Sequence, residues 1–175
     1  MTAPADQRRN RGRSALRTAP AYLVILSLWL GATLFFALVV ARAAFQVLPS
    51  RSLAGQLVGQ TLPVLLLAGV VGGILALWAE LAAAMAPGRR LRLFCAASVA
   101  ILSQAANLVG QHVNRLLEST GSVFESLAPA DPVRVSFGRW HGAAVLLMGL
   151  AMLLAAIAIV SAARAMPDYG DGGQP

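Results

Sequence analysis

The chain has 175 residues, of which 58% are hydrophobic and 12% are charged, and its formal net charge is +7. A soluble domain is about 25% charged, so this composition excludes an ordinary soluble fold and predicts a surface that faces lipid. The basic residues are all arginines, gathered in the N-terminal tail and beside apolar segments, which argues against a nucleic-acid-binding face.

Four apolar segments follow a basic N-terminal stretch. Residues 1–19 carry five arginines and predict a flexible cytoplasmic tail that binds anionic lipid headgroups. The predicted spans are 21–41, 61–86, 93–114 and 138–163, close to the ~20 residues that cross a ~30 Å hydrocarbon core as a helix. Residues 166–175 predict a flexible C-terminal tail. The sequence therefore predicts an all-α, integral membrane four-helix bundle within residues 20–165.

The first apolar segment has an alternative interpretation as a cleaved signal peptide. Ala41-Arg42-Ala43 resembles a cleavage site with small residues on either side of a variable one. Secretory apolar cores run only ~7–15 residues, and this segment is longer and contains Trp29. An uncleaved helix is the favoured interpretation.

The distribution of arginines predicts the orientation. With the N-terminus inside, the cytoplasmic side carries Arg8, Arg9, Arg11, Arg13, Arg17, Arg89, Arg90, Arg92 and Arg164. The other side carries Arg42, Arg51, Arg115, Arg134 and Arg139. Because positive charge accumulates in cytoplasmic loops, we predict an N-in, C-in protein of the bacterial cytoplasmic membrane.

Small and charged residues in the second span suggest how the helices pack. Gly69-x-x-x-Gly73 favours close approach of a neighbouring helix, because lipid offers no hydrophobic drive for helix association. The alternative is that glycine is merely abundant in this chain. Glu80 is expected to pair with a nearby arginine such as Arg17 or Arg92 rather than to serve as a proton or cation site.

The third span carries a polar stripe, which consists of Gln104, Asn107, Gln111 and Asn114. Steps of three and four residues place these side chains on one helix face. Polar groups are costly against lipid, so we expect the stripe to face the bundle interior or a wet cavity. Either it lines a path for a polar solute, ion or proton, or its amides bond to neighbouring helices.

The predicted orientation brings further polar side chains to the non-cytoplasmic membrane boundary. We call this set the outer cluster: Arg42, Gln46, Gln60, Gln111, His112, Arg115, Arg139 and His141. The two histidines, His112 and His141, are candidates for ligating a haem iron or copper. Two histidines alone make an incomplete zinc site, and the arginines suit an anion such as a lipid phosphate better than a cation.

Several short blocks resemble a known family. The first half of the transmembrane protein 205-like family is similar to a series of blocks here: Trp29-Leu30-Gly31, Phe35-Phe36, Phe45-x-x-Leu48-Pro49, Gly55, Gly59 and Pro63. The last helix of that family is similar to Phe137-Gly138-Arg139-Trp140-His141-Gly142. Asn107 matches a family asparagine. The resemblance covers about residues 28–154 and implies a polytopic four-helix membrane protein that contains a domain of unknown function.

No phosphate-binding loop, HExxH motif or GxSxG motif occurs in the sequence. We therefore expect a non-enzymatic protein without a cofactor: transport-related, lipid-interacting or an accessory subunit. Its expected partners are membrane lipids and a homo- or hetero-oligomer, without nucleic acid. The alternative is a haem- or copper-binding redox or metal-handling protein that uses His112 and His141.

Overall fold

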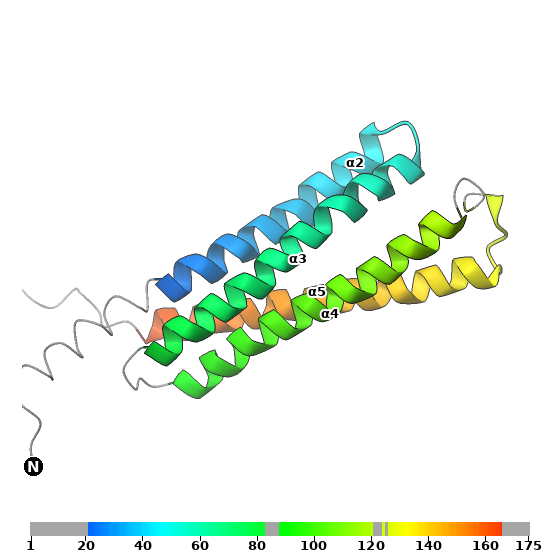
Figure 1. Ribbon diagram of the computed structural model, residues 1–175. Coiled ribbons are helices and arrows are strands. Elements are labelled where there is room, and N and C mark those ends of the chain that lie inside the picture. The colour runs from blue at the N-terminus through cyan, green and yellow to red at the C-terminus, as the bar shows by residue number, and fades with distance from the viewer. Residues whose placement is uncertain (1–20, 83–87, 121–123, 125, 166–175) are drawn as a thin grey trace, which may run out of the picture.

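The computed structural model describes residues 21–82, 88–120, 124 and 126–165. This part of the chain contains four long helices, Ala21–Val47, Arg51–Ala82, Arg89–Thr120 and Pro132–Arg164, each long and apolar enough to cross a membrane. They lie side by side as two helical hairpins (Figure 1). The fold is the predicted all-α bundle. The basic tail 1–19, residues 83–86 of the second predicted span and the tail 166–175 lie outside the described residues.

The first helix is longer than the predicted span. It contains a π-helical turn, η1 (Phe36–Val40), and continues as α2 (Ala41–Val47). It ends at Val47. The next residue, Leu48, has an extended backbone with ψ 143°, because the ring of the following Pro49 disfavours a helical conformation there. Arg42 and Gln46 therefore lie on a helix rather than in a loop.

Helix α3 (Arg51–Ala82) starts ten residues before the predicted span, so Pro63 lies inside the helix and not in its first turn. A proline inside a helix leaves the carbonyl four residues earlier without its N–H donor. That carbonyl belongs to Gly59. The side-chain amide of Asn114, from the next helix, donates to the Gly59 oxygen at 3.1 Å.

Helices α4 (Arg89–Thr120) and α5 (Pro132–Arg164) form the second hairpin. Gly88 precedes α4 with φ +75°, a left-handed conformation that glycine adopts without strain. Helix α5 begins six residues before the predicted span. Asp131 caps it by accepting a hydrogen bond from the Val133 amide at 2.8 Å, and Pro132 occupies its first turn, as both residue types favour.

The core lies towards one end of the bundle. Tyr22, Leu26 and Trp29 of the first helix pack there with Ala76, Cys95, Ala96 and Val99 and with an alanine stripe on α5, Ala151, Ala155, Ala158 and Ala162. We call this the Arg92 end and the opposite one the Asn114 end. The helices converge at the Arg92 end, whereas the tips of the two hairpins diverge at the Asn114 end (Figure 1).

Candidate functional site

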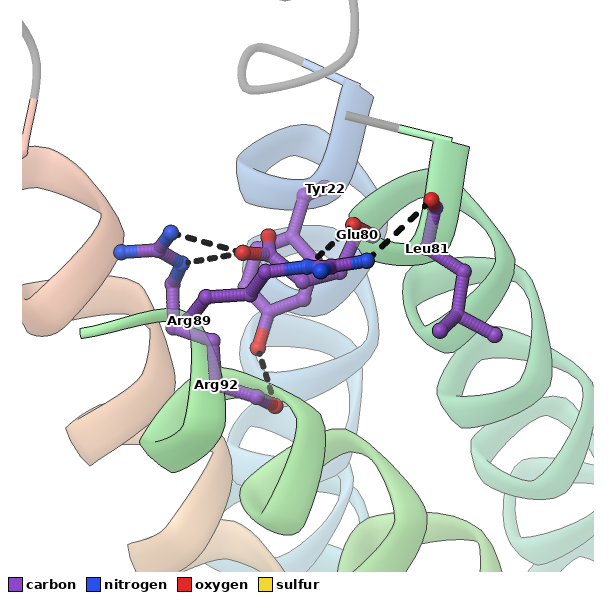
Figure 2. A network of polar contacts seen from close by, with 5 residues as sticks. All are labelled: Tyr22, Glu80, Leu81, Arg89 and Arg92. Atoms are coloured by element: carbon purple, nitrogen blue, oxygen red, sulfur yellow. Dashed lines mark hydrogen bonds and ion pairs between the residues drawn. The ribbon is translucent and has the colours of Figure 1, made fainter. Parts of the chain in front are cut away.

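A buried ion pair joins α3 to α4 at the Arg92 end (Figure 2). Arg92 donates from Nε at 2.9 Å and from a terminal nitrogen at 2.6 Å to the same carboxylate oxygen of Glu80. The two side chains are 5% and 6% exposed. The expected pairing of Glu80 with an arginine is thus confirmed for Arg92, while Arg17 lies outside the described residues.

Two further contacts extend this network. The Tyr22 hydroxyl donates to the Arg92 carbonyl at 3.1 Å, which ties the first helix to α4. The Arg89 guanidinium donates to the carbonyls of Glu80 and Leu81 at 3.3 Å, near the end of α3, where helical carbonyls lack amide partners. The network therefore neutralises buried charge, caps a helix and joins three helices (Figure 2).

Gly69 and Gly73 lie where α3 meets its neighbours. A Cβ on Gly69 would lie 2.6 Å from Ser103 Oγ and 2.7 Å from the Trp29 ring. A Cβ on Gly73 would lie 2.8 Å from the Ala100 nitrogen and 2.9 Å from the Ala96 oxygen. The Trp29 indole, which crosses Gly69, donates to the Leu65 carbonyl at 2.9 Å. Both glycines thus occupy positions that a larger residue would not fit.

The polar stripe on α4 divides between the interior and the outer surface. Asn114 bonds to Gly59, and Asn107 is half-buried, as is Gln111, whereas Gln104 is exposed. At 3.6 residues per turn these four positions spread over about 80° of helix surface. This arc is wide enough to include both buried and exposed positions of α4. The expected place in the bundle interior is therefore wrong for Gln104, whereas the alternative of a wet cavity stays a prediction.

Two buried polar atoms near the middle of the bundle have no hydrogen-bond partner in the described part of the chain. They are Ser103 Oγ and Asn107 Oδ1. Ser103 is fully buried and faces Gly69. Ser103 was not among the predicted site residues. Its position one residue before Gln104, next to the polar stripe, could have indicated a further polar group within the span.

The outer cluster divides between the two hairpins. Arg42, Gln46 and Gln60 belong to the first hairpin, whereas Gln111, His112, Arg115, Arg139 and His141 belong to the second, and the hairpin tips diverge (Figure 1). Apart from the half-buried Gln111, these side chains are exposed. The structure therefore presents two outward-facing polar groups at the Asn114 end.

Both histidines lie against aromatic rings of the second hairpin. His112 meets Trp140 edge-on with ring centroids 5.0 Å apart, and His141 stacks on Phe137 at 5.6 Å. Phe124 contacts Phe137 at 5.0 Å. The sequence reasoning missed this aromatic cluster, although Phe137 and His141 are four residues apart and thus share a helix face.

Within the described ranges, no group of three or more His, Cys, Asp or Glu side chains is placed to hold a metal ion. The haem or copper alternative, which needs fewer protein ligands, stays a prediction.

A groove of about 500 Å³ runs between the start of α4 and the end of α5, and Gly88, Leu91, Val160, Ser161 and Arg164 are among its lining residues. Its walls are mostly apolar. None of the predicted site residues lines it. The groove is therefore separate from the polar stripe and from the outer cluster.

Comparison with known proteins gives a match to a family model. A family model described as a domain of unknown function (DUF4149) matches residues 24–117, more than half of the chain. This region includes the contacts Trp29–Leu65, Asn114–Gly59 and Glu80–Arg92, and it ends before α5. Neither the curated proteins nor the solved structures yielded a match. The chain therefore belongs to the DUF4149 family.

Proposed function

We propose that this protein is a non-enzymatic subunit of a membrane assembly, whose partners bind the outward-facing polar side chains at the Asn114 end. It sits N-in, C-in in the bacterial cytoplasmic membrane. The observation that carries the proposal is a contrast between the interior, where charged and polar groups mostly pair within the chain, and the Asn114 end, where such groups are exposed.

The paired interior groups hold the bundle together. Burial of a charge is costly unless it is paired, and Glu80 and Arg92 pair with each other. The carbonyl freed by Pro63 receives the Asn114 amide. The hydrogen-bonding groups of these residues are paired within the chain, so they are not available to bind a ligand.

The exposed groups have the opposite character. Gln46 and Gln60 are exposed on the first hairpin, and Arg115, Arg139 and His141 are exposed on the second. Near the edge of the hydrocarbon layer, such side chains gain free energy from headgroups or from polar groups of another protein. Their placement on the two hairpins suits a partner that contacts both hairpins at the Asn114 end.

The relation to the transmembrane protein 205-like family is part of this proposal. Three residues of the resembling blocks support it through the roles they play here. Trp29 donates across Gly69 to α3, and Gly59 and Pro63 create the carbonyl site that Asn114 fills. These are contacts that a shared four-helix plan would retain.

Site-specific photocrosslinking in native membranes tests the proposal. A benzophenone side chain at Gln46 or His141 is expected to give discrete adducts with a protein of different mass. Leu28 and Leu146, 72% and 75% exposed on the same two helices, are the matched controls and are expected to give lipid adducts. Lipid adducts alone at all four positions would overturn the proposal.

A transport-related role is the second candidate, favoured by Ser103 Oγ and Asn107 Oδ1, which are buried without partners near mid-depth in the described part of the chain. Polar sites of transporters lie near the bilayer midplane. In a Cys95→Ala background, Ser103→Cys tests for a water path. Labelling by a membrane-impermeant thiol reagent supports this candidate, and complete protection rejects it.

A further inference from the structure

Helix α4 presents a regular face away from the rest of the bundle. Phe94, Ile101 and Leu108 recur every seven residues and are 63%, 67% and 56% exposed. Gln104 and Gln111 follow Ile101 and Leu108 by three residues. This alternation of three and four residues is the repeat by which two helices pack in a left-handed pair. In this chain α4 packs on α3 and α5 through its other faces.

Gln104 lies near the middle of the hydrocarbon layer. At ~1.5 Å per residue it is about 18 Å along α4 from Arg92 and about 16 Å from Arg115. Arg92 marks one end of the span and Arg115 the other, and the hydrocarbon core is ~30 Å thick. The Gln104 side chain is nevertheless exposed, and it makes no hydrogen bond within the described residues.

Lipid chains offer no hydrogen-bond partner to a side-chain amide at that depth. The Gln104 amide therefore requires another polar group beside it. Two copies inserted in the same orientation are related by an axis along the membrane normal, so each residue meets its own counterpart at equal depth. An amide both donates and accepts, and Gln104 therefore complements itself. We propose that a second copy of this chain docks on α4 through the face that contains Phe94, Ile101, Gln104, Leu108 and Gln111.

Charge supports the same pairing at the Asn114 end. Arg115 and Glu118 continue the repeat and are exposed. In a parallel pair they lie in neighbouring layers, so Arg115 of each copy is within reach of Glu118 of the other. The opposite charges offset the repulsion between the two arginines. Symmetry places these matching amides and opposite charges at equal depth only when the partner is a second copy of this chain.

This inference goes beyond the proposed function, whose partner is a different protein, and the two share only the idea that the protein is a subunit of an assembly. Cysteine cross-linking in native membranes tests it, in a Cys95→Ala background. Ile101→Cys, Gln104→Cys and Leu108→Cys are expected to give disulfide-linked dimers upon mild oxidation. Leu67→Cys, on α3 and 55% exposed, is the control at similar depth and is expected to stay monomeric.

A second measurement examines the amide itself. Gln104→Leu is expected to raise the dimer dissociation constant in vesicles about tenfold, the typical effect of one interhelical amide bond, while Gln104→Asn restores part of the affinity. Leu67→Ala serves as the control. Because Gln104 is exposed, the variants are expected to fold, and far-ultraviolet circular dichroism verifies this.

The outcomes separate the two proposals. Absence of dimers at all three α4 positions, or cross-links there to a different protein, overturns the homodimer. If photoadducts at Gln46 and His141 persist in that case, the proposed function stands. If α4 dimers form and those photoadducts are absent, the proposed function fails and the homodimer stands.

Discussion

Asn114 donates its side-chain amide to the Gly59 carbonyl, with 3.1 Å between nitrogen and oxygen, and Gly59 lies four residues before Pro63. The proline ring has no N–H, so this carbonyl lacks its helical donor. The Asn114 amide supplies the missing donor. One residue of α4 thus completes the hydrogen bonding of α3 and joins the two hairpins.

The first prediction concerns this bond. Asn114→Leu is expected to lower the free energy of unfolding by about 1–3 kcal/mol, because it leaves the half-buried Gly59 carbonyl without a donor. In a Pro63→Ala background the same change is expected to cost about 1 kcal/mol less, because an alanine at this position restores the backbone N–H that bonds to the carbonyl. Denaturant titration in mixed micelles measures both costs. If Asn114→Leu costs the same free energy of unfolding with Pro63 and with Ala at position 63, then Asn114 does not replace the donor that Pro63 lacks.

The second prediction concerns the buried ion pair. Arg92→Leu is expected to destabilise the bundle by about 3 kcal/mol, since it strands the Glu80 carboxylate away from water. The double variant Glu80→Leu/Arg92→Leu is expected to recover most of that loss. Thermal unfolding in detergent compares the three proteins. If the double variant is as unstable as Arg92→Leu, then the stranded charge is not the cause.

The third prediction uses two glycines of different surroundings. Gly69→Ala is expected to cost about 1–3 kcal/mol, as overpacking of a close contact does, and to shift Trp29 fluorescence by displacing the indole. Gly31→Ala is the matched control, because a Cβ there meets nothing within 4 Å. Its stability and its emission spectrum are expected to match the parent. An unchanged spectrum for Gly69→Ala would show that Trp29 does not cross this glycine.

The fourth prediction addresses the histidines. Protein purified in detergent after growth with haem precursors and copper is expected to be colourless and free of stoichiometric metal. Absorption spectroscopy and elemental analysis provide the measurement. A haem band or stoichiometric copper that disappears in both His112→Ala and His141→Ala would instead establish the cofactor-binding alternative.

The sequence predicts the membrane location and the helical class well, because both follow from long apolar segments. It predicts helix bounds less well. The spans were placed by hydropathy alone, whereas Asp131 and Pro132 start α5 by local capping and Pro49 ends the first helix by sterics. Helical structure extends beyond the apolar segments at both of these places.

The site is harder to predict, because depth in the membrane does not determine lateral position. The outer cluster lies at one end, as its place in the sequence suggests, but divides between hairpins that diverge there (Figure 1). The helical periodicity predicts that Gln104 and Asn114 share one face of α4. It does not show that Asn114 contacts α3 whereas Gln104 is exposed. The bond between Asn114 and Gly59 joins positions 55 residues apart, which no local pattern reveals.

In the proposed topology four helices cross the bilayer and place the Arg92 and Asn114 ends on opposite sides. Single cysteines at Arg90 and Ala130, both exposed, test it most directly in a Cys95→Ala background. With a membrane-impermeant thiol reagent applied to intact cells, Ala130→Cys is expected to be labelled, and Arg90→Cys is expected to be labelled only after the cells are opened. Labelling of both positions in intact cells would contradict the four-span bundle.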